Sequence, residues 1–143
     1  MNIAIIGAGG RMGLAIVRLA IAAGDSIVGA ADIATSTHGK DIGELAGIEN
    51  LGVAVGPDAA SAVLGADVCI DFSSPKATPE VARAVMKEKI GWVCGTTGID
   101  DAAIRAHAGS GRRYWRFFLP HGLWDRARQR QGNARDQRPA LRA

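Results

Sequence analysis

The chain has 143 residues, 48% of them hydrophobic and 22% charged, with a formal net charge of +3. This length accommodates at most one ordinary domain, and the apolar content is sufficient for a core. No apolar run approaches the roughly 20 residues that cross a bilayer, and the N-terminus lacks the basic start of a secretory leader. The composition therefore predicts a cytoplasmic protein without a membrane partner.

The charge is divided unevenly along the chain. Residues 1–111 hold 8 Lys or Arg and 12 Asp or Glu, whereas residues 112–143 hold 9 Arg and 2 Asp. The basic balance therefore comes from the C-terminal segment alone. Cys69 and Cys94 are far apart and lack the spacing of metal ligands, so we interpret them as buried thiols in a reducing compartment and predict no metal site.

The first predicted element is a buried strand over residues 2–6, which leads through a glycine loop into a helix over about 11–23. The loop reads Gly7, Ala8, Gly9, Gly10, Arg11, Met12, Gly13. Glycines at a strand-to-helix turn permit a tight bend and a close approach of the backbone to a ligand. The free N–H groups of the helix N-terminus can hold a pyrophosphate. The pattern predicts a dinucleotide-binding loop.

A second predicted strand, over about 26–32, ends in Asp32. A carboxylate at this place accepts hydrogen bonds from the adenosine ribose of a dinucleotide, although an aspartate can also simply cap the end of a strand. Ile33 follows, where an arginine would favour the 2′-phosphate of NADP; the nearest cation is Arg11, on the loop itself. The sequence favours NAD over NADP and leaves dual use open.

Further strands and helices alternate through the first hundred residues. The predicted segments are a polar loop over 34–40, a helical piece over 43–46, a strand over 51–55, a helix over 57–64 with Pro57 in its first turn, a strand over 68–72, a helix over 75–87 capped by Ser74, a strand over 91–94 and a helix from Asp100 or Asp101 to about 108. This alternation predicts an α/β fold, a Rossmann-like doubly wound parallel sheet with helices on both faces.

Two more loops follow strands of that sheet, one over residues 71–75 and one over 95–98. Ligands of open parallel sheets lie beyond the carboxyl ends of the strands, so both loops point to the edge that carries the glycine loop. The hydroxyls and amides around Thr96 and Thr97 suit the carboxamide and ribose of a nicotinamide, or else form a helix-entry turn. Asp71 can act there or merely anchor its loop.

Together these segments resemble the dihydrodipicolinate reductase (4-hydroxy-tetrahydrodipicolinate reductase) family of bacterial lysine biosynthesis, over residues 1 to about 110. The matching segments are residues 7–13, 43–47, 70–73 with Pro75, and 95–98. The resemblance implies an NAD(P)H-dependent oxidoreductase that transfers hydride to a cyclic imine dicarboxylate. It implies these cofactor-binding residues: Gly7, Ala8, Gly9, Gly10, Arg11 and Met12 at the pyrophosphate, Asp32 at the ribose, Phe72 and Ser73 flanking the cofactor, and Gly95, Thr96 and Thr97 at the nicotinamide.

The family's second domain carries its substrate-binding and proton-donating residues and its homo-oligomer contacts, and nothing here matches it. We therefore expect a dinucleotide-binding domain over 1–111, an Arg-rich aberrant tail over 112–143, no catalytic residues, and no turnover by this chain alone. The alternative is a stand-alone dinucleotide-sensing module. Nucleic-acid binding by the tail is disfavoured, because its arginines follow no helical or strand period and it contains no lysine.

The tail differs from the rest of the chain in its amino-acid usage. From residue 112 on there is no Ile, Val, Lys, Glu, Ser, Thr or Met, whereas the first 111 residues contain 13 Ile and 9 Val. A folded α/β domain keeps one composition up to its next core strand. We therefore predict that residues 112–143 are a frameshifted reading without native structure, which resequencing of the gene tests; a natural Arg-rich tail is the alternative.

Overall fold

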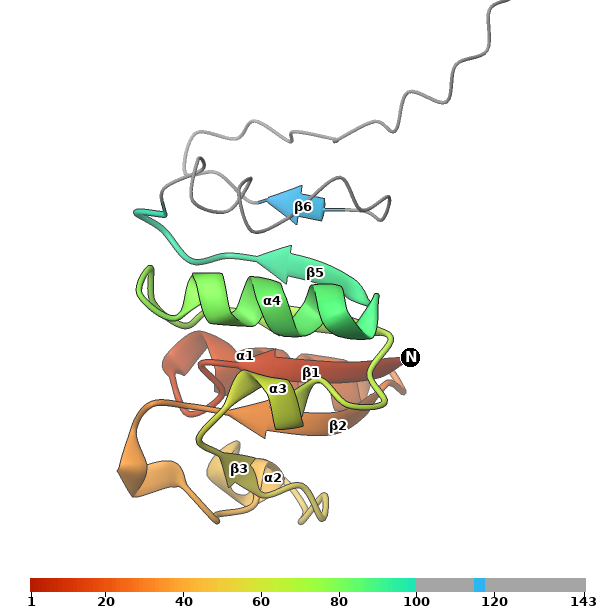
Figure 1. The fold of residues 1–143 in the computed structure, drawn as a ribbon. Helices are drawn as coiled ribbons and strands as arrows, with labels where there is room; N and C mark the ends of the chain where they lie inside the picture. Colours follow the sequence, from red (N-terminus) through yellow and green to blue (C-terminus); the bar gives the residue numbers. More distant parts are fainter. Residues whose placement is uncertain (100–114, 118–143) are drawn as a thin grey trace, which may run out of the picture.

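The computed structural model describes residues 1–99 and 115–117, and in these ranges six strands form one parallel sheet (Figure 1). The order across the sheet is β3-β2-β1-β4-β5-β6. The strands are β1 (Asn2–Ile6), β2 (Ser26–Ala31), β3 (Val55–Gly56), β4 (Val68–Asp71), β5 (Gly91–Cys94) and β6 (Trp115–Phe117). The chain builds outward from β1 to β3 and then returns to the other side of β1. The order of the strands therefore reverses between β1 and β4, which confirms the predicted doubly wound sheet.

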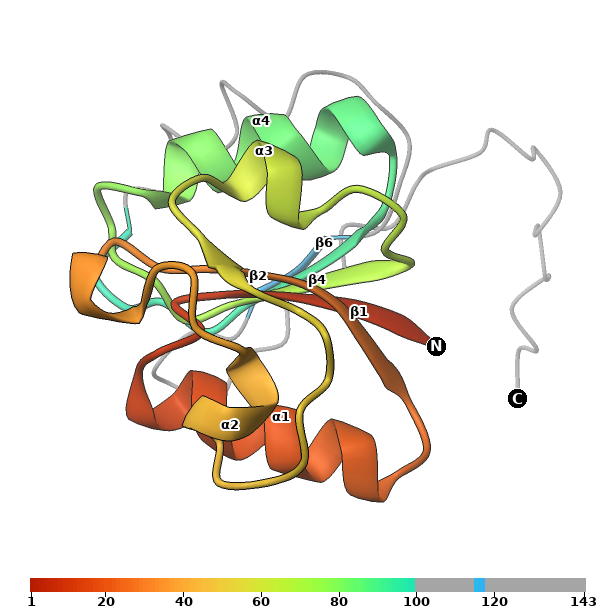
Figure 2. The same ribbon diagram turned by 90° about the horizontal axis from the view of Figure 1, so that it is seen from below.

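Helices cover both faces of the sheet, as Figure 2 shows. Helices α1 (Arg11–Ala22) and α2 (Ile42–Leu45) lie on one face, and α3 (Ala59–Ala62) and α4 (Thr78–Glu88) lie on the other. A short 3₁₀ turn, η1 (Thr35–Thr37), follows β2. None of the described helices is long and apolar enough to cross a membrane.

The central strand β1 is buried on both faces, which explains its unbroken aliphatic sequence. Ile3 and Ile5 pack in the core beneath α1 and α2, while Ala4 and Ile6 pack in the core beneath α3 and α4. Alternate residues of a strand point to opposite faces. Each β1 side chain from Ile3 to Ile6 is therefore at most 4% exposed.

Several predicted boundaries differ from the structure. Strand 91–94 is confirmed, and the strands predicted to end at 32 and 72 each end one residue earlier. The helix predicted over 57–64 is the shorter α3, because Asp58 caps it by accepting a hydrogen bond from Ser61 N at 2.8 Å, so Pro57 lies outside. The helix predicted from 75 begins at Thr78, after a turn in which Ser74 O accepts from Thr78 N.

The strand predicted over 51–55 is largely wrong, because Asp41 binds its backbone instead. Asp41 Oδ1 accepts from Leu51 N at 3.0 Å and Oδ2 accepts from Val53 N at 2.8 Å. These donors are thereby removed from the sheet, and only Val55–Gly56 pair with β2. The helix predicted over about 100–108 lies outside the described residues.

Strand β6 lies within the segment for which the sequence predicts no native structure. Its backbone pairs in parallel with β5, with Cys94 opposite Phe117. This pairing extends the sheet by one strand, and the interpretation of residues 112–143 as a frameshifted segment stays a prediction. The prediction for the rest of 112–143 falls outside the described residues.

The Asp41 carboxylate yields a prediction about acid stability. Besides Leu51 and Val53, it accepts from Gly43 N and Glu44 N at the start of α2. Although burial alone raises the pKa of Asp41, these four N–H donors together hold the pKa below the ordinary value of 3.8. A carboxylate with a lowered pKa stabilises the fold above its unfolded-state pKa and loses that contribution as pH falls through its folded-state pKa.

We therefore expect Asp41→Asn to lower the free energy of unfolding by about 2 kcal/mol at pH 7. The difference in unfolding free energy between variant and wild type should shrink below about pH 4, because the wild-type carboxylate becomes protonated there and is then neutral like the amide. Urea unfolding at pH 7 and at acidic pH measures both values. The same change at Asp67, an exposed carboxylate that accepts one backbone hydrogen bond, from Asn2 N, serves as the control. A difference that is independent of pH would contradict the prediction.

Candidate functional site

The glycine loop leaves β1 through a left-handed residue and closes on two neighbouring strand ends. Gly7 has φ +74°, and a Cβ there would lie 2.5 Å from Phe72 O. Gly7 N and Ala8 N both donate to Ala31 O, at 2.9 and 3.1 Å. Only glycine fits at position 7, and the loop is thereby fixed between the ends of β2 and β4.

The N-terminus of α1 is open at the surface. Gly10 is its N-cap residue and supplies no side-chain acceptor, and the first turn contains no acidic residue. Gly10, Arg11 and Met12 are exposed. The first N–H groups of a helix have no intrahelical acceptor, and the helix dipole favours an anion there. This end of α1 can therefore bind a phosphate or pyrophosphate group.

Close packing holds α1 against the loop that precedes it. A Cβ on Gly13 would overlap the carbonyl oxygens of Gly7 and Ala8, the latter at 2.6 Å. Gly9 is similarly restricted, since its Cβ would lie 2.7 Å from Thr37 Cγ2 and 3.2 Å from Asp32 Oδ2. The spacing of these glycines is thus required for the loop to pass between α1 and the residues after β2.

Asp32, directly after β2, binds backbone groups on both of its sides. Its Oδ2 accepts from Gly9 N and its Oδ1 accepts from Ala34 N, both at 2.8 Å. His38 Nε2 lies 2.7 Å from the carbonyl oxygen of Asp32. Asp32 therefore does cap the end of β2, which is one of the two roles that the sequence leaves open for it. A carboxylate has about four lone-pair sites, so Asp32 retains acceptor capacity for a ligand hydroxyl.

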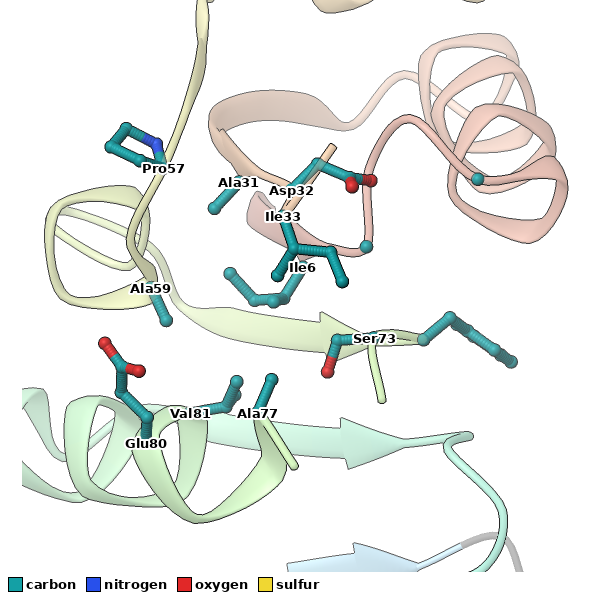
Figure 3. Close-up of a pocket in the computed structure, with 13 residues that line it drawn as sticks. Ile6, Ala31, Asp32, Ile33, Pro57, Ala59, Ser73, Ala77, Glu80 and Val81 are labelled. Carbon is teal, nitrogen blue, oxygen red and sulfur yellow. The ribbon is translucent and has the colours of Figure 1, made fainter. Parts of the chain in front are cut away.

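A pocket of about 260 Å³ opens beside the glycine loop, between the ends of β1 and β2 and helices α3 and α4 (Figure 3). Its wall is mainly apolar, including Ile33, Pro57, Ala59 and Val81. Three polar side chains also line it: Asp32, Ser73 and Glu80. A flat apolar group with a few polar atoms suits such a pocket.

The loop after β4 joins the loop after β5. Asp71 is fully buried, and its Oδ1 accepts from Ser73 N at 2.9 Å and from Ser73 Oγ at 2.6 Å. The ring of Phe72 covers Gly95, where a Cβ would lie 2.8 Å from the Phe72 Cδ1 atom. With the Phe72 ring in this position, residue 95 has no room for a Cβ.

The two threonines after β5 differ in exposure. Thr96 is 8% exposed, and its hydroxyl lies 3.5 Å from Asp71 Oδ1 as a donor. Thr97 is exposed. The prediction treats both hydroxyls alike, and the structure differs at Thr96 because Asp71 binds its hydroxyl inside the fold.

Cys69 and Cys94 are free thiols in this structure, and their predicted burial is confirmed. Burial and, after it, the charge of Asp71 together raise the pKa of Cys94 to about 12. Burial also raises the pKa of Cys69 well above its usual value. Both thiols therefore stay protonated at neutral pH and are poor nucleophiles.

The predicted site residues gather at one edge of the sheet, but not in one cavity. Gly7, Gly10, Asp32, Phe72 and Ser73 line the pocket. Ala8, Gly9, Arg11 and Met12 belong to the same loop and helix start, whereas Gly95, Thr96 and Thr97 follow β5 beyond the lining residues.

Sequence reasoning considered Ile33 only as a position without a cation, and it missed the rest of the opposite wall of the pocket, formed by Pro57, Ala59, Glu80 and Val81. Pro57 directly follows β3, so the rule that ligands lie beyond strand ends could have found it. The α4 residues carry no such signal, because their approach depends on how α4 packs on the sheet.

Sequence comparison with known proteins gives a family and several relatives. Residues 1–109 match the family model described as "Dihydrodipicolinate reductase, N-terminus". The 4-hydroxy-tetrahydrodipicolinate reductase of Alkalilimnicola ehrlichii is 45% identical over 107 residues, covering 73% of this chain and 40% of the relative. The enzyme of the same name from an Anaeromyxobacter species is 41% identical over 122 residues, covering 85% of this chain and 45% of the relative. The chain thus spans less than half the length of these relatives.

Solved structures share the fold. The dipicolinate-bound dihydrodipicolinate reductase of Paenisporosarcina sp. TG-14 aligns with a TM-score of 0.54 at 24% identity, over 75% of this chain and 41% of that one. An amine dehydrogenase from Mycobacterium smegmatis aligns with a TM-score of 0.59 at 24% identity, over 66% of this chain and 29% of that one. At these identities the likeness concerns the fold alone.

Proposed function

Because this chain belongs to the dihydrodipicolinate reductase family, as the match over residues 1–109 shows, we propose that it binds NAD(H) or NADP(H) as the cofactor-binding part of a 4-hydroxy-tetrahydrodipicolinate reductase. The observation that carries the proposal is the open N-terminus of α1 behind a loop that admits only glycine at Gly7 and Gly13. A bound nicotinamide cofactor supplies the hydride of the reaction, and the protein supplies binding and orientation.

The residues of the site fit such a cofactor in three parts. The pyrophosphate meets the N–H groups at the start of α1, where Gly10 adds no side chain in the way. The ribose hydroxyls donate to Asp32, and the adenine lies against the apolar wall formed by Ile33 and Pro57. This orientation directs the nicotinamide half across β1 toward the loops after β4 and β5, because dinucleotides lie across the point where strand order reverses.

Asp32 also favours NAD over NADP in this proposal. A 2′-phosphate would lie beside the Asp32 carboxylate, and like charges repel each other. The following residue, Ile33, is 74% exposed and provides no cation to compensate. Arg11 is the cation of the loop and is exposed at the start of α1, so it reduces this preference without reversing it.

Isothermal titration of the chain with NADH, NADPH and ADP-ribose tests the proposal. We expect NADH to bind with a Kd on the order of 100 µM, and NADPH to bind about fivefold more weakly because of Asp32. Absence of binding by all three ligands would refute the proposal.

We also propose that the chain alone does not reduce the substrate. A positioned acid or base contributes about 10²–10⁴-fold to such a reaction, and the one histidine among residues 1–99, His38, is held against the Asp32 carbonyl. Oxidation of NADH should therefore not exceed the rate without protein when 4-hydroxy-tetrahydrodipicolinate is added. A substrate-dependent rate above that background would contradict this part of the proposal.

A further inference from the structure

Asp71 is a buried carboxylate that binds two separate loops. It ends β4 and is 0% exposed. Its Oδ1 accepts from the backbone N and the hydroxyl of Ser73, and also lies 3.5 Å from the hydroxyl of Thr96. Its Oδ2 lies 3.6 Å from Cys94 Sγ. The donors therefore come from the loop after β4, from the end of β5 and from the loop after β5.

A simple strand cap does not require this arrangement. Burying a carboxylate costs free energy unless hydrogen bonds or an ion pair compensate. Among the described residues no Lys or Arg forms an ion pair with Asp71. Three of its four donors are polar side chains, and two of these, on Cys94 and Thr96, belong to a neighbouring part of the sheet. The free-energy cost of burying the Asp71 carboxylate is thus offset by hydrogen bonds that join the two loops.

The backbone strengthens the same connection. Gly95 N donates to the carbonyl oxygen of Asp71 at 2.8 Å, and the Phe72 ring lies over Gly95. The loops after β4 and β5 therefore form one packed unit, with Asp71 at its centre. This unit lies on the side of β1 opposite to Asp32 and β2.

We infer that Asp71 is a positioning residue for the nicotinamide half of the cofactor. It does not touch the cofactor, because it is fully buried. It fixes the distance between Ser73 and the Gly95–Thr97 backbone, and these loops form the surface on which the nicotinamide and its ribose rest. The inference rests on the proposed function, and it assigns to Asp71 an effect on one half of the dinucleotide only.

The two halves can be separated by comparing NADH with ADP-ribose, which lacks the nicotinamide. In the full chain we expect NADH to bind about tenfold more tightly than ADP-ribose. Asp71→Ala should reduce this ratio to about twofold while ADP-ribose affinity stays within about twofold of wild type. Asp71→Asn should keep most of the ratio, because its amide oxygen can accept from Ser73 and Thr96 in the same place.

A second pair of variants tests the connection if Asp71→Ala does not fold. Thr96→Val removes the hydroxyl with little change in shape, and we expect it to reduce the ratio of NADH to ADP-ribose affinity about threefold. Thr96→Ser keeps a hydroxyl at this position and should show the wild-type ratio. Asp67→Ala, at the opposite end of the strand, is the matched control and should leave the ratio unchanged.

The outcomes separate this inference from the proposed function. If wild type binds neither ligand, the proposed function fails. If wild type shows the tenfold ratio and both Asp71→Ala and Thr96→Val keep it, the inference about Asp71 is overturned. If Asp71→Asn loses the ratio as fully as Asp71→Ala, the charge of Asp71 acts rather than its position, which also overturns the inference.

Discussion

Gly10→Asp is expected to stabilise the chain and at the same time to abolish dinucleotide binding. Gly10 is the N-cap of α1, with φ −75° and ψ 163°, and it provides no side-chain hydrogen bond to the helix. Aspartate is among the preferred N-cap residues, because its carboxylate accepts from the free N–H groups of the first turn and interacts favourably with the helix dipole. The substitution should therefore add about 0.5–1 kcal/mol to the free energy of unfolding.

The same carboxylate would occupy the proposed pyrophosphate position. It consumes the N–H donors that the phosphate needs and repels the anion, so we expect NADH affinity to fall at least about 100-fold. Space does not prevent the substitution: a Cβ on Gly10 would lie 3.3 Å from Gly7 O, a contact that a small shift relieves.

Thermal unfolding and titration of the same samples check the two effects together. The midpoint should rise by about 3–5 °C while binding disappears. Gly10→Asn is the matched control, since it caps the helix without the negative charge and should retain part of the affinity. Unchanged NADH affinity in Gly10→Asp would exclude the α1 N-terminus as the binding site.

The sequence predicts the sheet well where a segment is buried on both faces. The β1 sequence predicts a buried strand because Ile3, Ile5 and the residues between and after them are all apolar. The predicted strand at Gly91–Cys94 is confirmed as β5. The glycine loop is equally predictable, because backbone atoms lie so close to Gly7 and Gly13 that neither position has room for a side chain.

Other features depend on interactions between distant residues and leave no local pattern. Val53 belongs to an apolar stretch that resembles a strand, but Asp41, twelve positions earlier, accepts its N–H. The sequence predicts that the Thr96 hydroxyl faces a ligand, but in the fold this hydroxyl lies beside Asp71 and donates to its carboxylate. The wall contributed by Glu80 and Val81 requires the packing of α4, which no motif encodes. The frameshift interpretation of residues 112–143 stays a prediction.

Gly13→Val should have the opposite effect on stability from Gly10→Asp, although both positions are in the same loop and helix start. A Cβ at position 13 would overlap the carbonyl oxygens of Gly7 and Ala8. Neither carbonyl can withdraw easily, because Gly7 N and Ala8 N are both bound to Ala31 O and Ala8 is fully buried. We expect the free energy of unfolding to fall by about 3 kcal/mol or more, and NADH binding to be lost as α1 moves away from the loop.

A comparison of variants isolates the cause of that loss. The overlap arises at Cβ, so Gly13→Ala should lower the unfolding midpoint nearly as much as Gly13→Val, by about 10 °C or more. Ala22→Val, at an exposed position of α1, introduces the same β-branched residue without an overlap and should cost only about 0.6 kcal/mol. If Gly13→Ala were as stable as wild type and bound NADH normally, the close contact between α1 and the loop would not be a requirement of the site. A large loss in both Gly13 variants together with a small loss in Ala22→Val would trace the requirement to the missing Cβ, since helix propensity alone cannot produce that difference.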